Sequence, residues 1–551
     1  MTPTHYICKY TPTELLTALG GDCVLLDEAP ENFDLSDQVA HPNLCGFGKS
    51  ILQAVLSGGV RELVLVNCCD TIRSAYDILK AHGKLDFLYM LDLLHNQDGC
   101  SVDHAKGQLL ALAEAYRAYK GTQFDRDAFL RAFAPVRPLS GPHITVLGAR
   151  MGQALFDMTQ SLLPLPAENS TCVNNRSVAL PPDPPEDFDG LMGAYARALL
   201  GQIPCMRMTD KSGRKRLYND PGLAGVVYHT VKFCDYYGFE YAQLKEELSV
   251  PLLKLESDGT RQSQEQLRTR LEAFAEGLHR EDAPLRRSPA GKGYYAGIDS
   301  GSTTTDVVIL DQERSVKAKV ILPTGAGASG GAARALEQAL QEAGLTQADL
   351  SATVTTGYGR SVISTGDKSI TEITCHAKGA HFLNPDVRTV IDIGGQDSKV
   401  IRLDEAGGVV NFVMNDKCAA GTGRFLEMMA RTLELTLEEI SQVGLVWNED
   451  ITISSMCTVF ADSEVVSLVA QNKALPDIVH GLNKSVAARA AALFRRVKGE
   501  AVCMMTGGVS HNQGVVQAIE ETLGLPLFIH EDAQLCGALG AALFAWEMPM
   551  E

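Results

Sequence analysis

The sequence predicts an α/β protein in which an N-terminal pair of doubly wound parallel-sheet lobes precedes a C-terminal domain of a second α/β type. Three observations support this prediction. The chain has 551 residues, more than one hydrophobic core accommodates, so we expect two to four domains. Short apolar, β-branched runs alternate with helical segments in the first half. A charged, Pro- and Gly-rich segment then separates this half from strands joined by Gly-, Ser- and Thr-rich turns.

The first half contains several candidates for buried parallel strands. Each is a short apolar run that ends in a polar or Cys-bearing turn, as do strands that helices cover on both faces. We expect residues 1–285 to form the two lobes, divided near residue 140, with ligands at the carboxyl ends of the strands. The strand candidates are residues 61–68, 143–150, 224–230 and 251–257.

A helix and a linker are predicted at the end of this half. Ser263 is suited to cap a helix over residues 263–278, because Gln266 follows at the capping-box position. The segment that follows the helix is rich in charge, Pro and Gly and lacks periodicity. We therefore place a linker at 286–293 and the second domain at 294–551.

Three segments of the second half predict a binding site for nucleotide phosphates: GIDSGSTTTD (297–306), DIGGQDSK (392–399) and MMTGGVSHN (504–512). Small residues let backbone N–H groups approach phosphates, and Ser and Thr hydroxyls add donors. A single Gly turn is equally well explained as a hairpin, whereas three in this order indicate ATP binding. The residues expected to contact the nucleotide are Gly301, Ser302, Thr303, Thr304, Gly394, Gly395, Gly507 and Gly508.

Polar side chains in and between these segments are the candidate catalytic residues. Asp299 and Asp392 are expected to hold Mg²⁺, which prefers one or two carboxylates together with phosphates and water. Gln396 is placed to orient an attacking water. Glu372 and His376 lie between the first two segments and are candidates for linking the nucleotide state to lobe movement, although a lone His is more often structural.

Composition restricts the classes of function. The formal net charge of −18 argues against broad binding of nucleic acid or anionic membranes, because phosphates are held by an excess of Lys and Arg. The N-terminus lacks a signal-peptide pattern and no run of 18 apolar residues occurs, so we expect a cytoplasmic protein without a membrane span. In a reducing compartment the 14 cysteines are expected to be cluster ligands, reactive thiols or buried apolar residues.

Two cysteines of the second half are candidate ligands of an iron–sulfur cluster. Cys418 lies in NDKCAAGTGRFLE and Cys457 in SSMCTVFADSEV, each near an expected helix start, where the charge of a thiolate is stabilised. A [4Fe–4S] cubane takes four Cys ligands, so a symmetric homodimer with two ligands from each protomer is the simplest arrangement. By contrast, Cys375, Cys503 and Cys536 lie in apolar contexts and are expected to be core residues.

The candidate cysteines of the first half are scattered, so the fold must assemble any site that they share. None forms a CxxC pattern typical of zinc sites, and a vicinal pair allows a redox-reactive alternative. These cysteines are Cys8, Cys45, Cys68, Cys69, Cys172, Cys205 and Cys234.

The phosphate segments of residues 294–548 resemble those of the ATPase superfamily that contains actin, sugar kinases and heat-shock proteins (ASKHA). Together with NDKCAAGTGRF and SSMCTVFADSE, they resemble more narrowly the ATP-dependent activators of 2-hydroxyacyl-CoA dehydratases and the related ATPase subunits of benzoyl-CoA reductases. This resemblance implies two duplicated α/β lobes with ATP and Mg²⁺ in the cleft between them. It also implies a [4Fe–4S] cluster that bridges a homodimer.

Residues 5–280 resemble the subunits of 2-hydroxyacyl-CoA dehydratases and the related double-cubane cluster proteins. The motifs HPNLCGFGKS, CCDTIRSAYD and GVVYHTVKFCDYYGFE carry the resemblance. It implies one cubane if the dehydratase pattern holds and two if the double-cubane pattern holds, and the number of motif cysteines favours two. The implied ligands are Cys45, Cys69 and Cys234 for the first cubane, with Cys8, Cys172 and Cys205 for the second.

These resemblances imply a fusion of an iron–sulfur electron acceptor with its ATP-dependent electron donor. Ferredoxin or flavodoxin is the expected electron source. The expected output is dehydration of a 2-hydroxyacyl-CoA, with or without a dehydratase partner subunit, or reduction of a small substrate. Two alternatives stay open. A sugar kinase of the same superfamily has no use for the Cys pair, whereas a regulatory or cluster-maturation ATPase acts on a separate partner.

Overall fold

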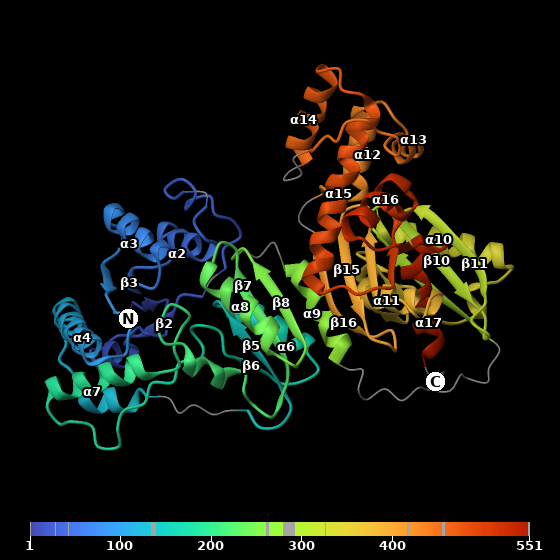
Figure 1. Ribbon diagram of the computed structural model, residues 1–551. Helices are drawn as coiled ribbons and strands as arrows, with labels where there is room; N and C mark the ends of the chain where they lie inside the picture. Colours follow the sequence, from blue (N-terminus) through green and yellow to red (C-terminus); the bar gives the residue numbers. More distant parts are fainter. Residues whose placement is uncertain are drawn as a thin grey trace. The chain divides into compact units, whose positions relative to one another are not determined.

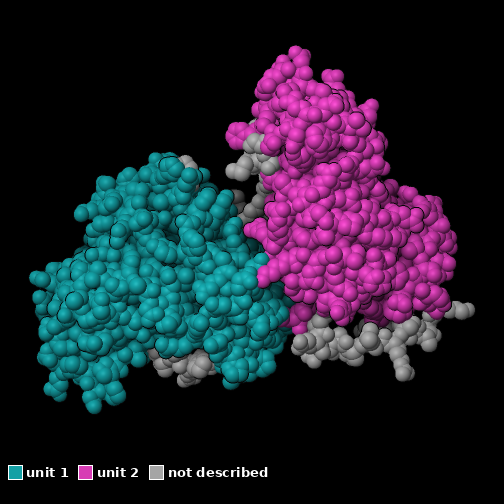
Figure 2. Space-filling model, viewed as in Figure 1, with its two compact units in different colours: residues 1–275 teal, residues 276–551 magenta. Residues whose placement is uncertain are grey.

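The computed structural model describes residues 2–27, 29–41, 43–133, 139–260, 264–278, 293–325, 327–415, 419–453 and 458–548. The chain divides into two compact units, residues 1–275 and 276–551, which are coloured separately in Figure 2. The predicted helix cap Ser263 and the predicted linker, apart from Gly293, lie outside the described residues. Among the helices of the described part of the chain, none is long and apolar enough to span a membrane.

The first unit contains two four-stranded sheets, and all their neighbouring strands run parallel (Figure 1). The strand orders are β2-β1-β3-β4 and β6-β5-β7-β8. This arrangement confirms the predicted pair of parallel α/β lobes. The strands of the first sheet are β1 (Thr4–Tyr6), β2 (Cys23–Leu25), β3 (Glu62–Val66) and β4 (Phe87–Leu91), and those of the second are β5 (His143–Gly148), β6 (Ala167–Asn169), β7 (Leu223–Val231) and β8 (Leu252–Ser257).

Helices alternate with these strands, and their ends follow from local sequence. The longest described helix of this unit, α4, begins where the Asp98 side chain accepts a hydrogen bond of 2.8 Å from the Ser101 N–H, and it ends at Gly121 in the left-handed region. The helices are α1 (Thr13–Ala18), α2 (Gly46–Leu56), α3 (Asp70–His82), α4 (Gly99–Lys120), α5 (Arg126–Arg131), α6 (Gln153–Leu162), α7 (Phe188–Gly201), α8 (Asp235–Glu247) and α9 (Gln264–Leu278), with a short 3₁₀ helix η1 (Ser212–Leu217).

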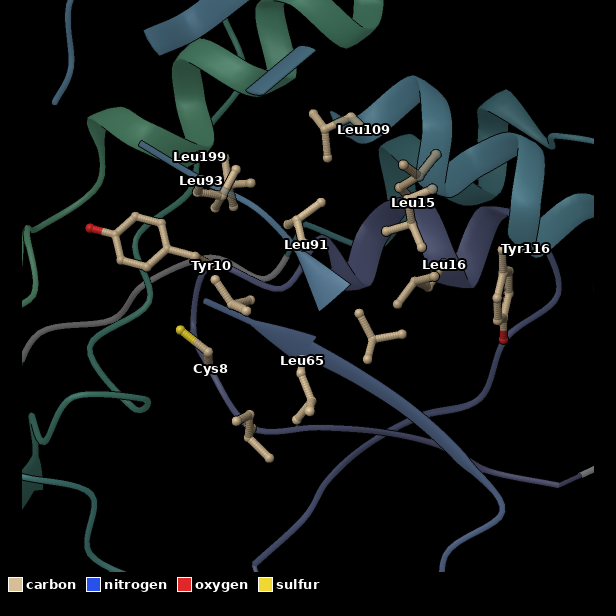
Figure 3. Close-up of a cluster of buried hydrophobic side chains, with 14 of the residues drawn as sticks. Cys8, Tyr10, Leu15, Leu16, Leu65, Leu91, Leu93, Leu109, Tyr116 and Leu199 are labelled. Carbon is tan, nitrogen blue, oxygen red and sulfur yellow. The ribbon is translucent and has the colours of Figure 1, made fainter. Parts of the chain in front are cut away.

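The core beneath the first sheet draws on residues from both parts of this unit. Figure 3 shows Leu199 of α7 beside Leu93, with Tyr10 near them. Helix α7 follows β6 in the chain, yet its apolar side chains belong to the core of the first sheet. Helix α7 therefore packs with the first lobe, although it follows a strand of the second lobe in the chain.

The second unit contains two five-stranded mixed sheets with the same pattern of pairing. Their strand orders are β11-β10-β9-β12-β13 and β16-β15-β14-β17-β18. In each sheet an antiparallel half is joined to a parallel half at the third strand. This repetition confirms the predicted duplicated lobes. The strands are β9 (Tyr294–Ser300), β10 (Thr304–Leu310), β11 (Val316–Pro323), β12 (Leu350–Thr356), β13 (Lys368–Ser369), β14 (Thr389–Ile393), β15 (Ser398–Leu403), β16 (Val409–Asn415), β17 (Cys503–Thr506) and β18 (Leu527–Phe528).

Helix α11 connects the first of these sheets to the second, and α17 packs against both α11 and β9. The predicted core cysteines Cys375, Cys503 and Cys536 are fully buried in this unit, as expected. The helices are α10 (Ala328–Ala343), α11 (Glu372–Leu383), α12 (Gly423–Thr432), α13 (Leu437–Val443), α14 (Thr458–Ala470), α15 (Leu475–Val497), α16 (Gln513–Leu523) and α17 (Cys536–Glu547), with 3₁₀ helices η4 (Gln347–Asp349), η5 (Arg360–Val362), η6 (Gly508–His511) and η7 (Ala533–Leu535).

Candidate functional site

A cavity of about 590 Å³ in the second unit is lined by residues from all three predicted phosphate turns. These turns follow β9, β14 and β17, which belong to the parallel halves of the two sheets. The C-terminal ends of all three strands lead into the cavity lining. All eight residues predicted to contact the nucleotide line the cavity, as do Asp299, Asp392 and Glu372. Gln396 is exposed on the β14–β15 turn and is absent from the cavity lining.

The turns of the two sheets meet at Gly395. A Cβ atom on this residue would lie 2.1 Å from the Thr303 hydroxyl oxygen, which is closer than any side chain tolerates. A side chain here would displace that of Thr303, so glycine favours the close approach of the β9–β10 turn to the β14–β15 turn. This contact brings hydroxyl and N–H donors of both sheets to one end of the cavity.

Strand register sets two carboxylates opposite each other in the first sheet. Asp299 on β9 pairs with Asp306 on β10, so both side chains emerge on the same face. Burial raises the pKa of Asp299 to about 7, and the neighbouring Asp306 contributes to the rise. Burial also raises the pKa of Asp306 to about 7. A cation placed between them would favour the ionised form of both.

Strand register also places Lys399 beside Asp392. The two residues pair across β14 and β15, and Lys399 Nζ lies 3.1 Å from Asp392 Oδ2. The same ammonium lies 2.9 Å from Asp397 Oδ2 and 3.4 Å from Glu372 Oε2. All four side chains are buried. Burial raises the pKa of Glu372 to about 8 against the opposing effect of Lys399.

His376 lies between the two predicted Mg²⁺ aspartates. Its Nε2 is 3.8 Å from Asp299 Oδ2 in the first sheet, and its Nδ1 is 3.6 Å from Asp392 Oδ1 in the second. Burial would raise the pKa of Asp392, but His376 and Lys399 outweigh it and hold that pKa at about 2. The Thr506 hydroxyl donates a hydrogen bond of 2.9 Å to Asp392 Oδ1. Side chains of α11 therefore join the acidic groups of both sheets.

Several lining residues were not singled out from the sequence, namely Asp306, Tyr358, Asp397 and Lys399. Two of them lie inside the quoted segment DIGGQDSK, where a Lys directly before the apolar residues Val400 and Ile401 was the available signal. Their contact depends on the β14–β15 register, which the sequence pattern does not define.

The cavity suits a nucleotide with a bound cation. Asp306 Oδ1 is buried and has no hydrogen-bond partner among the described residues. An orphaned carboxylate oxygen of this kind requires a cation or water, and Mg²⁺ takes such oxygen ligands. With Asp299 opposite, the site offers two carboxylates next to the hydroxyl-rich turn.

The first unit presents three of the predicted cluster cysteines in the same local setting. Cys45, Cys69 and Cys234 are the residues immediately before α2, α3 and α8. Free N–H groups and the helix dipole favour negative charge at this position. A Cβ on Gly46 would lie 1.7 Å from the Asp258 carbonyl oxygen, so the start of α2 touches the loop after β8. This close contact joins the two lobes beside Cys45.

The thiols influence one another electrostatically. Burial raises the pKa of Cys234 to about 12, and the neighbouring thiols of Cys45, Cys172 and Cys69 add to the rise. Burial likewise raises the pKa of Cys172 to about 11, with contributions from Cys8 and Cys205. The structure therefore brings the six predicted ligands into one neighbourhood of the first unit.

Cys68 lies between the two predicted ligand sets. Its thiol lowers the pKa of Cys8 to about 6 and the pKa of Cys69 to about 7 by hydrogen bonding. Cys8 belongs to one set and Cys69 to the other. The vicinal pair noted in the sequence thus occupies the junction of the two sets.

Buried cations surround these thiols. Arg207 is 8% exposed, its Nη1 donates to the Asn67 carbonyl at 2.6 Å, and its guanidinium lies over the Tyr10 ring. Its Nε and Nη2 find no oxygen or nitrogen acceptor among the described residues, and the Cys205 thiol lies beside the guanidinium. Lys9 is 1% exposed and donates to Asn175 Oδ1 at 2.6 Å. Buried donors without acceptors imply that an anionic group belongs beside them.

These features suit the ligand requirements of an iron–sulfur cluster. Among the described residues, no group of three or more His, Cys, Asp or Glu side chains is close enough to hold one ion. A cubane spreads its cysteines over separate iron atoms, and its sulfides accept hydrogen bonds. The spaced thiols and the orphaned Arg207 donors are consistent with such a group. Cys418 and Cys457 lie outside the described residues, although α14 begins directly after Cys457.

Comparison with known families divides the chain in the same way. Residues 296–545 match the BadF/BadG/BcrA/BcrD ATPase family. Residues 8–137 and 135–278 match the 2-hydroxyglutaryl-CoA dehydratase D-component family.

Individual relatives resemble about half of the chain. The activator of lactoyl-CoA dehydratase from Anaerotignum propionicum is 49% identical over 254 residues, covering 46% of this chain and 98% of the relative. The (R)-2-hydroxyglutaryl-CoA dehydratase activating ATPase from Acidaminococcus fermentans is 46% identical over 255 residues, covering 46% and 97%. A solved structure of the activator of the 2-hydroxyisocaproyl-CoA dehydratase from Clostridium difficile with bound ADPNP is 43% identical, with a TM-score of 0.45 and coverage of 46% and 94%.

Proposed function

This chain belongs to the BadF/BadG/BcrA/BcrD ATPase family, and on that premise we propose that it uses ATP to deliver low-potential electrons from its C-terminal half to its N-terminal half. The output would be dehydration of a 2-hydroxyacyl-CoA or reduction of a small substrate. The relatives named as activators of dehydratases, and the match of residues 8–278 to a dehydratase component, support this proposal. One polypeptide would then contain both the activator and the protein that it activates.

The observation that carries the nucleotide part of the proposal is the cavity of the second unit. It gathers the three phosphate turns and their hydroxyl donors within about 590 Å³, together with the carboxyl groups of Asp299, Asp306, Glu372, Asp392 and Asp397. Asp299 would hold Mg²⁺ with the phosphates, together with Asp306 opposite it and Asp392 across His376. Gly394, Gly395, Gly507 and Gly508 would let the backbone approach the nucleotide. The relative from Acidaminococcus fermentans, described as an activating ATPase, supports hydrolysis.

The observation that carries the electron-acceptor part is the gathering of buried or partly buried thiols with buried cations in the first unit. Cys45, Cys69 and Cys234 would hold one cubane, and the second set, if occupied, would hold another. When bound, such clusters supply one-electron carriers whose potential depends on charge and hydrogen bonds around the sulfurs. The Arg207 guanidinium would donate to this group and balance its charge.

Cys418 and Cys457 would supply the ligands of a cluster shared by two copies of the chain. Ferredoxin or flavodoxin would reduce it. In such a scheme ATP would supply the free energy for electron transfer to a cluster of lower potential, since each tenfold shift of a one-electron equilibrium corresponds to about 59 mV.

Within the second unit, α11 would transmit the nucleotide state. Glu372 and His376 project from one face of α11 toward the acidic groups of both sheets. A change in the charges bound at Asp299 and Asp392 would therefore alter the contacts of a single helix with both lobes. Coupling requires an element of this kind, whose arrangement a ligand biases.

The test is the double substitution Cys418→Ala/Cys457→Ala in the full chain. We expect loss of the visible absorbance and of the EPR signal of the shared cluster, loss of the dimer, and an unchanged affinity for MgATP. Cys503→Ala is the matched control, because Cys503 is a buried residue of β17 with no proposed role as a ligand. It should leave the cluster signals, the dimer and the affinity for MgATP unchanged. Retention of the shared-cluster signal in the double variant would overturn the bridging proposal.

A further inference from the structure

Lys399 is the buried cation at the centre of the acidic side of the nucleotide cavity. Its Nζ lies within 3.4 Å of carboxylate oxygens from Glu372, Asp392 and Asp397. The side chain is 3% exposed and lines the cavity. We propose that Lys399 is a positioning residue that makes metal binding depend on nucleotide, because its ammonium occupies the carboxylates that would otherwise bind a free divalent cation.

The position of Lys399 follows from strand geometry. β15 pairs antiparallel with β14, and in this register Lys399 faces Asp392. The residues around it on β15, Ser398, Val400 and Ile401, are also buried, so the charge of Lys399 lies in the interior of the unit. A charge in such a setting persists only when paired.

The three carboxylates come from three different elements. Glu372 is the first residue of α11, Asp392 lies on β14 and Asp397 lies in the β14–β15 turn. Without a cation, carboxyl groups this close together would disfavour one another's ionised forms in a medium of low polarity. The single ammonium holds them together before any nucleotide arrives.

The cluster around Lys399 contains more carboxyl groups than ammonium groups. One ammonium faces three carboxyl groups, so the cluster keeps an affinity for a further cation while Lys399 weakens that affinity. A nucleotide brings its cation together with phosphate oxygens, which can accept hydrogen bonds from a displaced ammonium. A free divalent cation offers Lys399 no such exchange. Lys399 therefore discriminates between a free metal ion and a metal–nucleotide complex.

The inference deepens the proposed nucleotide site, and its test is made without nucleotide so that the two can fail separately. Mn²⁺ is the probe, because binding to protein removes the EPR signal of the free ion. The full chain and Lys399→Met are titrated with Mn²⁺ alone and again with Mn²⁺ and ATP. We expect Lys399→Met to bind Mn²⁺ at least about tenfold more tightly without nucleotide, and to lose most of the gain in affinity that ATP gives the native chain.

Three variants make the result specific. Lys399→Arg keeps the charge and should retain native Mn²⁺ binding. Lys378→Met removes another lysine of the same unit, which pairs with Glu547 away from the cavity, and should change nothing. Adding Asp392→Asn to Lys399→Met should abolish the gain in Mn²⁺ affinity.

A folded Lys399→Met chain whose Mn²⁺ affinity without nucleotide is unchanged or weaker would overturn the inference. If that variant does not fold, Lys399→Gln combined with Asp397→Asn restores the native charge balance. This double variant should bind Mn²⁺ more tightly than Asp397→Asn alone. Equal affinities of the two variants would also overturn the inference. Absence of ATP binding by the native chain would instead refute the proposed nucleotide site and leave the Mn²⁺ comparison interpretable.

Discussion

The affinity for MgATP should fall as the pH is lowered through 7, because Asp299 must be ionised to hold the cation. Burial and the opposing Asp306 raise the pKa of Asp299 to about 7. At pH 8 about nine-tenths of this carboxyl is ionised, and at pH 6 about one-tenth is. The affinity should therefore fall about tenfold between pH 8 and pH 6. Asp306 is raised by the same cause, so the two groups titrate as a pair and can only steepen the change.

The assay is titration of the full chain with MgATP at pH 6, 7 and 8 by calorimetry. Asp299→Asn, measured under the same conditions, shows how much of the pH dependence comes from protonation of the nucleotide itself. It should bind MgATP weakly, with little pH dependence beyond that of the nucleotide. Asp450→Asn, which removes a surface partner of Lys484, should behave as the native chain does. If the native chain and Asp299→Asn show the same pH profile, Asp299 does not act through the cation.

Three further results are expected. Without nucleotide, the melting temperature of the second unit should fall as pH rises from about 4 to about 7, because the folded state retains protons on its buried carboxyls that the unfolded chain releases. MgATP should reduce this pH dependence. A melting temperature that stays constant over this range would contradict the prediction. Arg207→Gln should lower the reduction potential of the cluster of the first unit without lowering its iron content, since it removes a cation beside an anionic group; an unchanged potential would place Arg207 outside the site. Leu109→Ala should lower the free energy of unfolding by about 2–5 kcal/mol, measured by urea denaturation, whereas Leu94→Ala at an exposed position should change it by less than about 0.5 kcal/mol.

Strand patterns and turn residues were enough to predict the main architecture. Runs such as 61–68 and 143–150 end at polar turns, and both became buried parallel strands. The Gly-rich turns were equally visible, because phosphate approach requires small residues at fixed positions. Local sequence determines these features.

Features that depend on long-range contacts could not be predicted. The sequence does not indicate that α7 packs under the first sheet, since its apolar face would suit either lobe. It also does not place Lys399 beside Asp392, because that contact depends on the register of β14 and β15. The convergence of Cys8, Cys172 and Cys205 likewise arises only when three distant loops are folded together.

The most direct test of the central claim is the iron and sulfide content of anaerobically purified chain, with EPR before and after addition of dithionite and MgATP. A cluster shared by two protomers contributes about two irons per chain, and each cubane of the first unit adds about four. We therefore predict about six irons for one N-terminal cubane or about ten for two, with a new reduced signal that requires MgATP. About two irons per chain would contradict the account, because the N-terminal half would then hold no electron acceptor.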